Sequence, residues 1–128
     1  AQEDYYNFIR NKHHIVMKIY HNPRCAISRE GLKYLERKGY DIEIVNYLNK
    51  GLTVNELQEI IAKTGKKPFD LVRTQERDYK TLYKAKELSD DEWIKILVEK
   101  PKLLRRPIVV NGSKAVLANP PEMVENIV

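Results

Sequence analysis

The first 47 residues alternate between strand and helix patterns, and this order restricts the possible folds more than any other feature of the chain. Residues 15–20 are rich in β-branched side chains, which is typical of a strand. Residues 31–39 carry leucines at helical spacing and end on glycine, a common stop signal for a helix. Residues 41–47 alternate polar and apolar side chains and predict a second strand. A strand–helix–strand unit of this length predicts parallel pairing with a right-handed crossover.

The middle of the chain carries helix signals. Thr53 has the sequence context of a helix N-cap, and apolar side chains follow it at helical spacing up to Gly65. Residues 66–86 have a weaker pattern that predicts two short helical pieces. Ser89 starts another helix with acidic residues in its first turn, and Pro101 ends it. We therefore predict a helical insertion here.

The last part of the chain predicts a hairpin and a final helix. Residues 107–110 and 114–117 are short apolar runs, separated by the turn signal Asn111-Gly112. Residues 120–127 begin on proline and predict a last helix. The predicted fold class is therefore α/β and thioredoxin-like, a βαβ unit followed by ββα, with the helical insertion between the two halves.

Length and composition narrow the functional classes. With 128 residues, the chain is expected to form one domain over residues 17–128, preceded by an N-terminal extension of residues 1–16. No apolar run approaches the roughly 20 residues needed to cross a membrane. The net charge of +5 is spread among acidic residues without a basic arm, so nucleic-acid binding is not expected.

Cysteine and histidine usage bears on redox compartment and metal binding. A single cysteine cannot form an internal disulfide, so a reducing cytoplasm is the expected compartment. His13 and His14 are adjacent, and on a strand they would point to opposite faces. No metal site is therefore expected.

The single cysteine, Cys25, lies where the first strand passes into the first helix. Free N–H groups and the helix dipole favour an anion at such a position, either a thiolate or a bound oxyanion. A lone cysteine is more often a small buried hydrophobic residue. Here, however, Arg24, Ser28 and Arg29 surround it, and positive charge lowers the pKa of a thiol. We predict a nucleophilic thiolate beside an oxyanion pocket.

Three motifs in series resemble the arsenate reductase family that is coupled to glutathione and glutaredoxin. They are Asn22-Pro23-Arg24-Cys25 with Ser28-Arg29, then Val72-Arg73-Thr74, then Arg106-Pro107-Ile108-Val109-Val110. The resemblance runs from about Met17 to Val128. It implies a thioredoxin fold with a helical insert and a cysteine that attacks arsenate. It also implies no tightly bound cofactor, with glutathione as co-substrate and glutaredoxin as protein partner.

The resemblance also implies roles for single residues. Cys25 matches the nucleophile, and Arg73 and Arg106 match two of three oxyanion-binding arginines. Guanidinium forks suit such a role because they bind tetrahedral oxyanions and keep their charge. A cis peptide bond is expected between Arg106 and Pro107. The supporting residues are His21, Asn22, Ser28, Arg29, Pro107 and Asn119.

The chain departs from the family pattern at two places. Asn119 stands where the third arginine is expected, and Ala26-Ile27 replaces a Gly-Thr pair. Asparagine offers a neutral amide in place of a charged donor fork, so arsenate should bind more weakly. A glutathionylated thiol is therefore an alternative substrate to arsenate.

Two other functions share part of this sequence pattern. A cysteine phosphatase needs an arginine about six residues after its cysteine, where this chain has Gly31. Regulators of the same fold bind RNA polymerase and commonly carry a C-x-x-C switch, but Ser28 occupies the second position here. Binding to RNA polymerase without redox chemistry is the remaining alternative.

Overall fold

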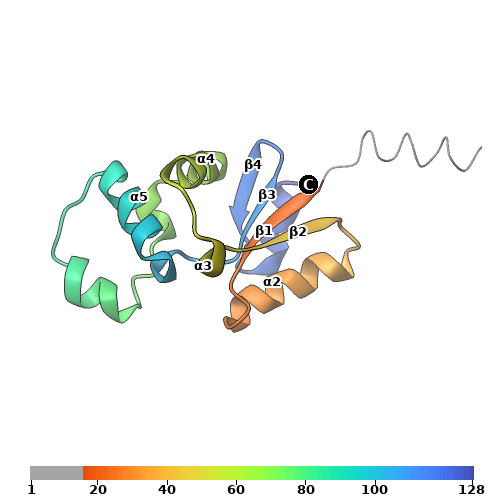
Figure 1. Cartoon of the computed structure of the whole chain (residues 1–128). Coiled ribbons are helices and arrows are strands. Elements are labelled where there is room, and N and C mark those ends of the chain that lie inside the picture. The colour runs from red at the N-terminus through yellow and green to blue at the C-terminus, as the bar shows by residue number, and fades with distance from the viewer. Residues whose placement is uncertain (1–15) are drawn as a thin grey trace, which may run out of the picture.

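A computed structural model describes residues 16–128 of the chain (Figure 1). The predicted extension, with its two adjacent histidines, lies outside the described residues except for Val16. The first half contains β1 (Met17–His21), α2 (Ala26–Arg37), β2 (Ile42–Asn46), α3 (Tyr47–Lys50) and α4 (Val54–Thr64). Next come the 3-10 turn η1 (Pro68–Leu71), the π-helical turn η2 (Tyr79–Tyr83), α5 (Asp90–Glu99) and the 3-10 turn η3 (Pro101–Leu103). The chain ends with β3 (Ile108–Asn111), β4 (Lys114–Leu117) and the 3-10 helix η4 (Pro121–Asn126).

The strands form one four-stranded sheet in the order β2-β1-β3-β4. β1 and β2 are parallel, whereas β1 pairs antiparallel with β3 and β3 pairs antiparallel with β4. This is the predicted thioredoxin-like order of βαβ followed by ββα. The helical segment from α4 to η3 lies between the two halves in sequence and to one side of the sheet (Figure 1). Both the fold class and the insertion are confirmed.

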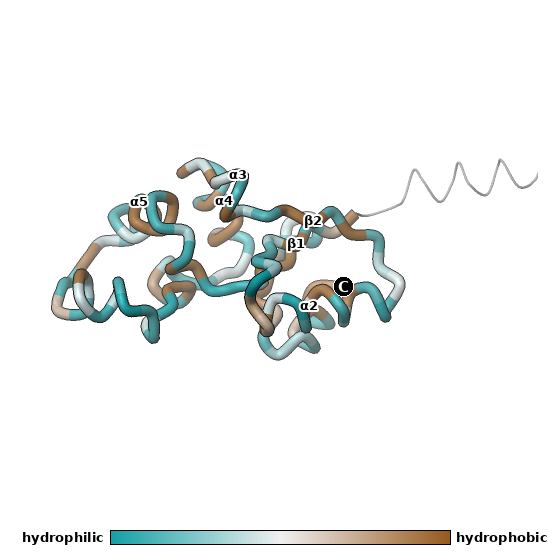
Figure 2. The backbone as a smooth tube through the Cα atoms, turned by 60° about the horizontal axis from the view of Figure 1, so that its bottom comes forward, coloured by the Kyte–Doolittle hydropathy of each residue, from teal (hydrophilic) through white to brown (hydrophobic). Residues whose placement is uncertain are grey.

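The sheet separates two apolar cores. Ile19 and Val109 point toward α2 and η4, whereas Tyr20 and Ile108 point toward the helical insertion. Successive strand residues face opposite sides, so β1 and β3 contribute to both cores. Along the tube of Figure 2, α2 and α5 alternate between hydrophobic and hydrophilic segments, as expected for helices with one buried face. Within residues 16–128, no helix is long and apolar enough to span a membrane.

Local signals fix the ends of the two long helices of the insertion. At α4, Thr53 Oγ1 accepts a hydrogen bond from the Glu56 N–H at 3.0 Å, and the Glu56 carboxylate accepts one from the Thr53 N–H at 3.2 Å. Ser89 and Glu92 form the same reciprocal cap at α5. Each cap satisfies N–H groups that the first helical turn leaves free. The two helix starts predicted from sequence are confirmed.

One detail of the C-terminal half differs from the prediction. Asn111 pairs with Lys114, so the hairpin loop is Gly112-Ser113 rather than Asn111-Gly112. Gly112 has a φ of 61° and Ser113 has no positive φ, which is the pattern of a type II′ turn. The predicted last helix is confirmed as η4, which is a 3-10 helix.

Helix α2 packs closely against the start of β3. Its buried residues are Ser28, Gly31 and Leu35, spaced three and four apart on one face. A Cβ at Gly31 would lie 2.6 Å from Cγ of Pro107, closer than real contacts allow. The expected cis peptide bond between Arg106 and Pro107 is confirmed, and a second one joins Asn119 to Pro120. The absence of a side chain at Gly31 therefore allows α2 to pack directly against the Pro107 ring.

We expect Gly31→Ala to lower the free energy of unfolding by about 2 kcal/mol, measured by urea denaturation. Alanine gains about 1 kcal/mol in helix propensity, but the collision with the rigid proline ring outweighs that gain. Lys33→Ala, at an exposed position of the same helix, is the control and should change stability by less than about 0.5 kcal/mol. Equal stability of the two variants would show that α2 can move away from Pro107 freely.

Candidate active site

The loop after β1 places Cys25 at the first turn of α2. The Cys25 N–H donates to the Asn22 carbonyl at 3.1 Å, and the Arg24 N–H donates to Oδ1 of Asn22 at 3.0 Å. A turn closed in this way by an asparagine side chain is a common local structure. Cys25 then has extended backbone angles and occupies the N-cap position of α2. The predicted strand-to-helix location of the cysteine is therefore present.

Ser28 joins the helix to the end of the strand. Its side chain is fully buried, and its Oγ accepts a hydrogen bond from the Asn22 N–H at 3.0 Å. The same Oγ lies 2.7 Å from Nδ1 of His21, which is also buried. Burial, followed by the charge of Arg29, lowers the pKa of His21 below its ordinary value, which favours the neutral imidazole. His21, Asn22 and Ser28 thus form a buried polar support beneath the cysteine loop.

The two arginines next to Cys25 in sequence do not line its cleft. Nη1 of Arg29 donates to the Pro23 carbonyl at 3.0 Å and so braces the loop. Arg24 is exposed and lines a neighbouring hollow with Asn22 and Pro23. Arg29 therefore supports the cysteine loop, and Arg24 lies beside it, but neither side chain lines the cleft.

Cys25 is half-buried and opens into a cleft of about 320 Å³. The residues that line the cleft are far apart in the sequence. They come from the first turn of α2, from the base of the helical insertion and from the segments on either side of the β3–β4 hairpin. Of the residues singled out from sequence, it brings together Cys25, Arg73, Arg106 and Asn119. Its complete lining is Cys25, Ile27, Val72, Arg73, Thr74, Gln75, Arg105, Arg106 and Asn119.

Three groups stabilise the thiolate against its partial burial. Burial alone raises the pKa of Cys25, but the Ser28 N–H, the Arg106 guanidinium and the Ile27 N–H together bring it below the ordinary thiol value. The thiol makes no capping hydrogen bond in the structure, so these N–H groups remain available to the charged sulfur. The site can therefore form a thiolate more readily than an ordinary cysteine.

The two family-matched arginines are held by the same carbonyl oxygen. Nη1 of Arg73 donates to the Lys102 carbonyl at 3.1 Å, and Nη1 of Arg106 donates to the same oxygen at 2.9 Å. Arg73 also lies 3.7 Å from the carboxylate of Glu76. Nε of Arg106 is buried and has no hydrogen-bond partner. A buried donor without a partner is unusual, so the hydrogen-bonding capacity of Arg106 is not fully used in the structure.

A short backbone pairing brings the two arginine segments together. Val72 and Leu104 form an isolated antiparallel bridge at the base of the insertion. The Arg73 N–H donates to the Leu103 carbonyl at 2.7 Å, and the Arg105 N–H donates to the Leu71 carbonyl at 2.8 Å. The arginine positions are therefore fixed by backbone hydrogen bonds as well as by side chains.

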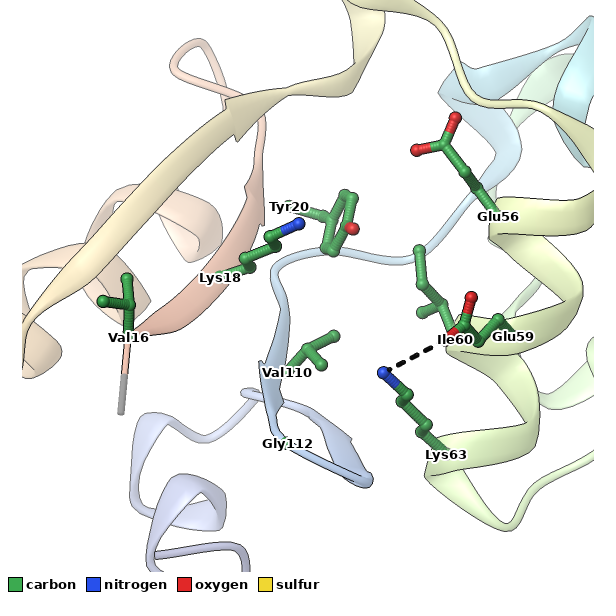
Figure 3. A pocket seen from close by; sticks show the side chains of 9 residues that line it. All are labelled: Val16, Lys18, Tyr20, Glu56, Glu59, Ile60, Lys63, Val110 and Gly112. Atoms are coloured by element: carbon green, nitrogen blue, oxygen red, sulfur yellow. Dashed lines mark ion pairs between the residues drawn. The ribbon is translucent and has the colours of Figure 1, made fainter. Parts of the chain in front are cut away.

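A second hollow, of about 270 Å³, lies between the sheet and α4 and has different chemistry (Figure 3). Lys63 there lies 3.5 Å from the carboxylate of Glu59, so its charge is already paired. Burial and nearby carboxylates raise the pKa of Tyr20, which keeps its hydroxyl protonated. Neither cysteine nor arginine lines this hollow. Within residues 16–128, no group of three or more His, Cys, Asp or Glu side chains could hold a metal.

Sequence reasoning missed two residues near the thiol. Arg105 lines the cleft, and its position next to Arg106 was the available signal. Tyr47 is fully buried with an unpartnered hydroxyl, and it interacts electrostatically with Arg106, Arg73 and Cys25. It directly follows β2, at the edge of the sheet where the parallel strands end.

Comparisons with known proteins agree with this geometry. The model of the ArsC family matches residues 20–127. An arsenate reductase of Haemophilus influenzae is 46% identical over 114 residues, which covers 85% of this chain and 96% of the relative. The uncharacterized protein YfgD of Escherichia coli is 41% identical over 114 residues, covering 88% of this chain and 96% of the relative. The solved structure of an arsenate reductase from Vibrio cholerae superposes with a TM-score of 0.84 at 37% identity, covering 90% of this chain and 99% of that chain.

We expect alkylation of Cys25 by iodoacetamide to rise with pH through a midpoint below that of an ordinary thiol, because the thiolate is the reacting form. Arg106→Gln should move the midpoint upward, since it removes a group that lowers the pKa of Cys25. Arg37→Gln, which removes the same charge at the far end of α2, should leave the midpoint unchanged. A midpoint that Arg106→Gln does not move would exclude this guanidinium from thiolate stabilisation.

Proposed function

Because the chain belongs to the ArsC family of arsenate reductases, we propose that it is a thiol-dependent oxidoreductase with Cys25 as its nucleophile. Membership of this family implies thiol-based redox chemistry. The observation that carries the proposal is a half-buried cysteine at the N-cap of α2, in one cleft with Arg73 and Arg106. A thiolate beside fixed cations is the arrangement needed to attack an anionic substrate.

With arsenate as substrate, the Cys25 thiolate attacks arsenic and forms an S–As bond. One arsenate oxygen leaves as water after taking up protons. Arg106 and Arg73, which line the same cleft as Cys25, bind the remaining oxygens. Because their guanidinium groups are held in place before the reaction, little reorganisation is needed as charge develops.

Glutathione then supplies the electrons. Its thiolate attacks the Cys25 sulfur, the S–As electron pair passes to arsenic, and arsenic leaves as arsenite. Cys25 is left in a mixed disulfide with glutathione. Glutaredoxin attacks the glutathione sulfur of this disulfide and releases the Cys25 thiolate. With only one cysteine in the chain, the resolving thiol has to come from another molecule.

A glutathionylated thiol, as substrate, would form the mixed disulfide of Cys25 and glutathione directly, without an S–As intermediate. Cys25 attacks the glutathione sulfur, the substrate leaves as a free thiol, and the same mixed disulfide with glutathione is formed. This route needs no third oxyanion ligand, which suits the neutral Asn119 in the cleft. We place the reaction in a reducing compartment such as the cytoplasm, where glutathione keeps thiols reduced.

The proposal is tested by NADPH oxidation in the presence of glutathione, glutaredoxin and glutathione reductase. The substrate is either arsenate or the mixed disulfide of glutathione and 2-mercaptoethanol. Wild type should accelerate at least one of the two reactions, and Cys25→Ser should reduce that rate to background because a serine hydroxyl is not ionised at neutral pH. Activity retained by Cys25→Ser would remove Cys25 from the mechanism.

We expect Asn119→Arg to lower the KM for arsenate about tenfold, because a charged donor replaces a neutral amide in the cleft. Asn119→Gln keeps a neutral amide and is the control, with a KM close to that of wild type. Steady-state kinetics of the three proteins provide the measurement. If wild type already reduces arsenate efficiently and Asn119→Arg does not lower the KM, then arsenate binding does not need a third arginine at position 119.

A further inference from the structure

The cleft at Cys25 is larger than a tetrahedral oxyanion requires. Its volume of about 320 Å³ falls within the range of small-molecule pockets, roughly 300–1,000 Å³. Beyond the thiol and the two arginines held by Lys102, its walls offer apolar, amide and hydroxyl groups. These come from Ile27, Val72, Thr74, Gln75 and Asn119. Such a mixture suits a ligand with peptide groups better than a bare inorganic ion.

Arg105 adds a third guanidinium group to this cleft. Its side chain is exposed, and its Nη1 donates one long hydrogen bond, 3.3 Å, to the Asp70 carbonyl. Arg73 lies beside the carboxylate of Glu76, but Arg105 has no carboxylate partner among residues 16–128. A guanidinium has five N–H donors, so most of those on Arg105 are free for a ligand.

The two neighbouring arginines lie at different depths. Arg106 is half-buried and lowers the pKa of the thiol, whereas Arg105 is exposed. The backbone N–H of Arg105 donates to the Leu71 carbonyl at 2.8 Å, so the backbone of Arg105 has a fixed position at the rim of the cleft. A ligand whose sulfur meets Cys25 would reach Arg105 with a group some distance from that sulfur.

We propose that Arg105 is a specificity-determining residue that binds a carboxylate of the thiol substrate. The cleft then selects acidic peptide thiols, such as glutathione, over neutral or cationic thiols. This inference rests on the proposed function, in which Cys25 forms a mixed disulfide with glutathione. A guanidinium fork binds a carboxylate through two parallel hydrogen bonds, which gives geometric selection as well as attraction. The amides of Gln75 and Asn119 provide donors and acceptors for the peptide groups.

The first test compares the rates at which reduced protein reacts with three disulfides, followed by mass spectrometry. Glutathione disulfide carries carboxylates, hydroxyethyl disulfide is neutral and cystamine is cationic. In each case the Cys25 thiolate attacks one sulfur and the other sulfur leaves as a thiolate, so no further oxidant is needed. We expect Arg105→Gln to slow the reaction with glutathione disulfide about tenfold, to change that with hydroxyethyl disulfide less than twofold, and not to slow that with cystamine.

Arg77→Gln is the matched control, because it removes the same charge from an exposed position that does not line the cleft. It should change the rate with glutathione disulfide less than twofold. An equal loss with all three disulfides in Arg105→Gln would overturn the inference, since it would indicate damage to the thiol or the fold. Equal rates for Arg105→Gln and Arg77→Gln with glutathione disulfide would also overturn it.

The second test measures binding of S-methylglutathione, whose sulfur cannot exchange, by calorimetry. Arg105→Gln should raise its Kd about tenfold, and Arg77→Gln should not. If the neutral disulfide reacts but wild type does not bind S-methylglutathione, the carboxylate site is wrong while the proposed reaction stands. If no disulfide reacts but S-methylglutathione binds through Arg105, the proposed reaction is wrong and the carboxylate site stands.

Discussion

The buried hydroxyl of Ser28 couples the end of β1 to the first turn of α2, and the position of the thiol depends on that coupling. Its Oγ accepts the Asn22 N–H and contacts the imidazole of His21. Cys25 lies three residues earlier on the same helix, so its sulfur is placed by the same contacts. One turn further along the same face, Gly31 meets Pro107, which directly follows Arg106 in sequence. One helix face therefore positions both the thiol and the segment that carries Arg106, which lowers the pKa of that thiol.

The second constraint is electrostatic. Two guanidinium groups repel each other, yet Arg73 and Arg106 donate to a single carbonyl oxygen, that of Lys102. The carbonyl dipole and the nearby carboxylate of Glu76 offset part of this repulsion. Both arginines line the cleft beside Cys25. An anion bound between the two guanidinium groups would reduce their repulsion, so the site favours an anionic ligand.

The sequence predicted the features that depend on local chemistry. The capping pairs at Thr53 and Ser89, the strand order and the place of Cys25 at a helix start all follow from short patterns of residue type. The positive charge that acts on the thiol could not be predicted from such short patterns. Arg24 and Arg29 are close in sequence but turn to other contacts, whereas Arg106 arrives through strand pairing some 80 residues later. Arginine side chains are long, so their location depends on tertiary contacts that no local pattern encodes.

The residues that line the cleft come from two parts of the fold. The thiol and its supporting groups belong to the βαβ half, while Thr74, Gln75 and Arg105 belong to segments joined by the Val72–Leu104 bridge at the base of the insertion. These rim residues are exposed, so their side chains can change without disturbing either apolar core. Cys25, by contrast, is held by buried groups that tolerate little change. The sheet half of the molecule therefore holds the thiol, whereas the exposed rim residues of the cleft lie at the base of the insertion.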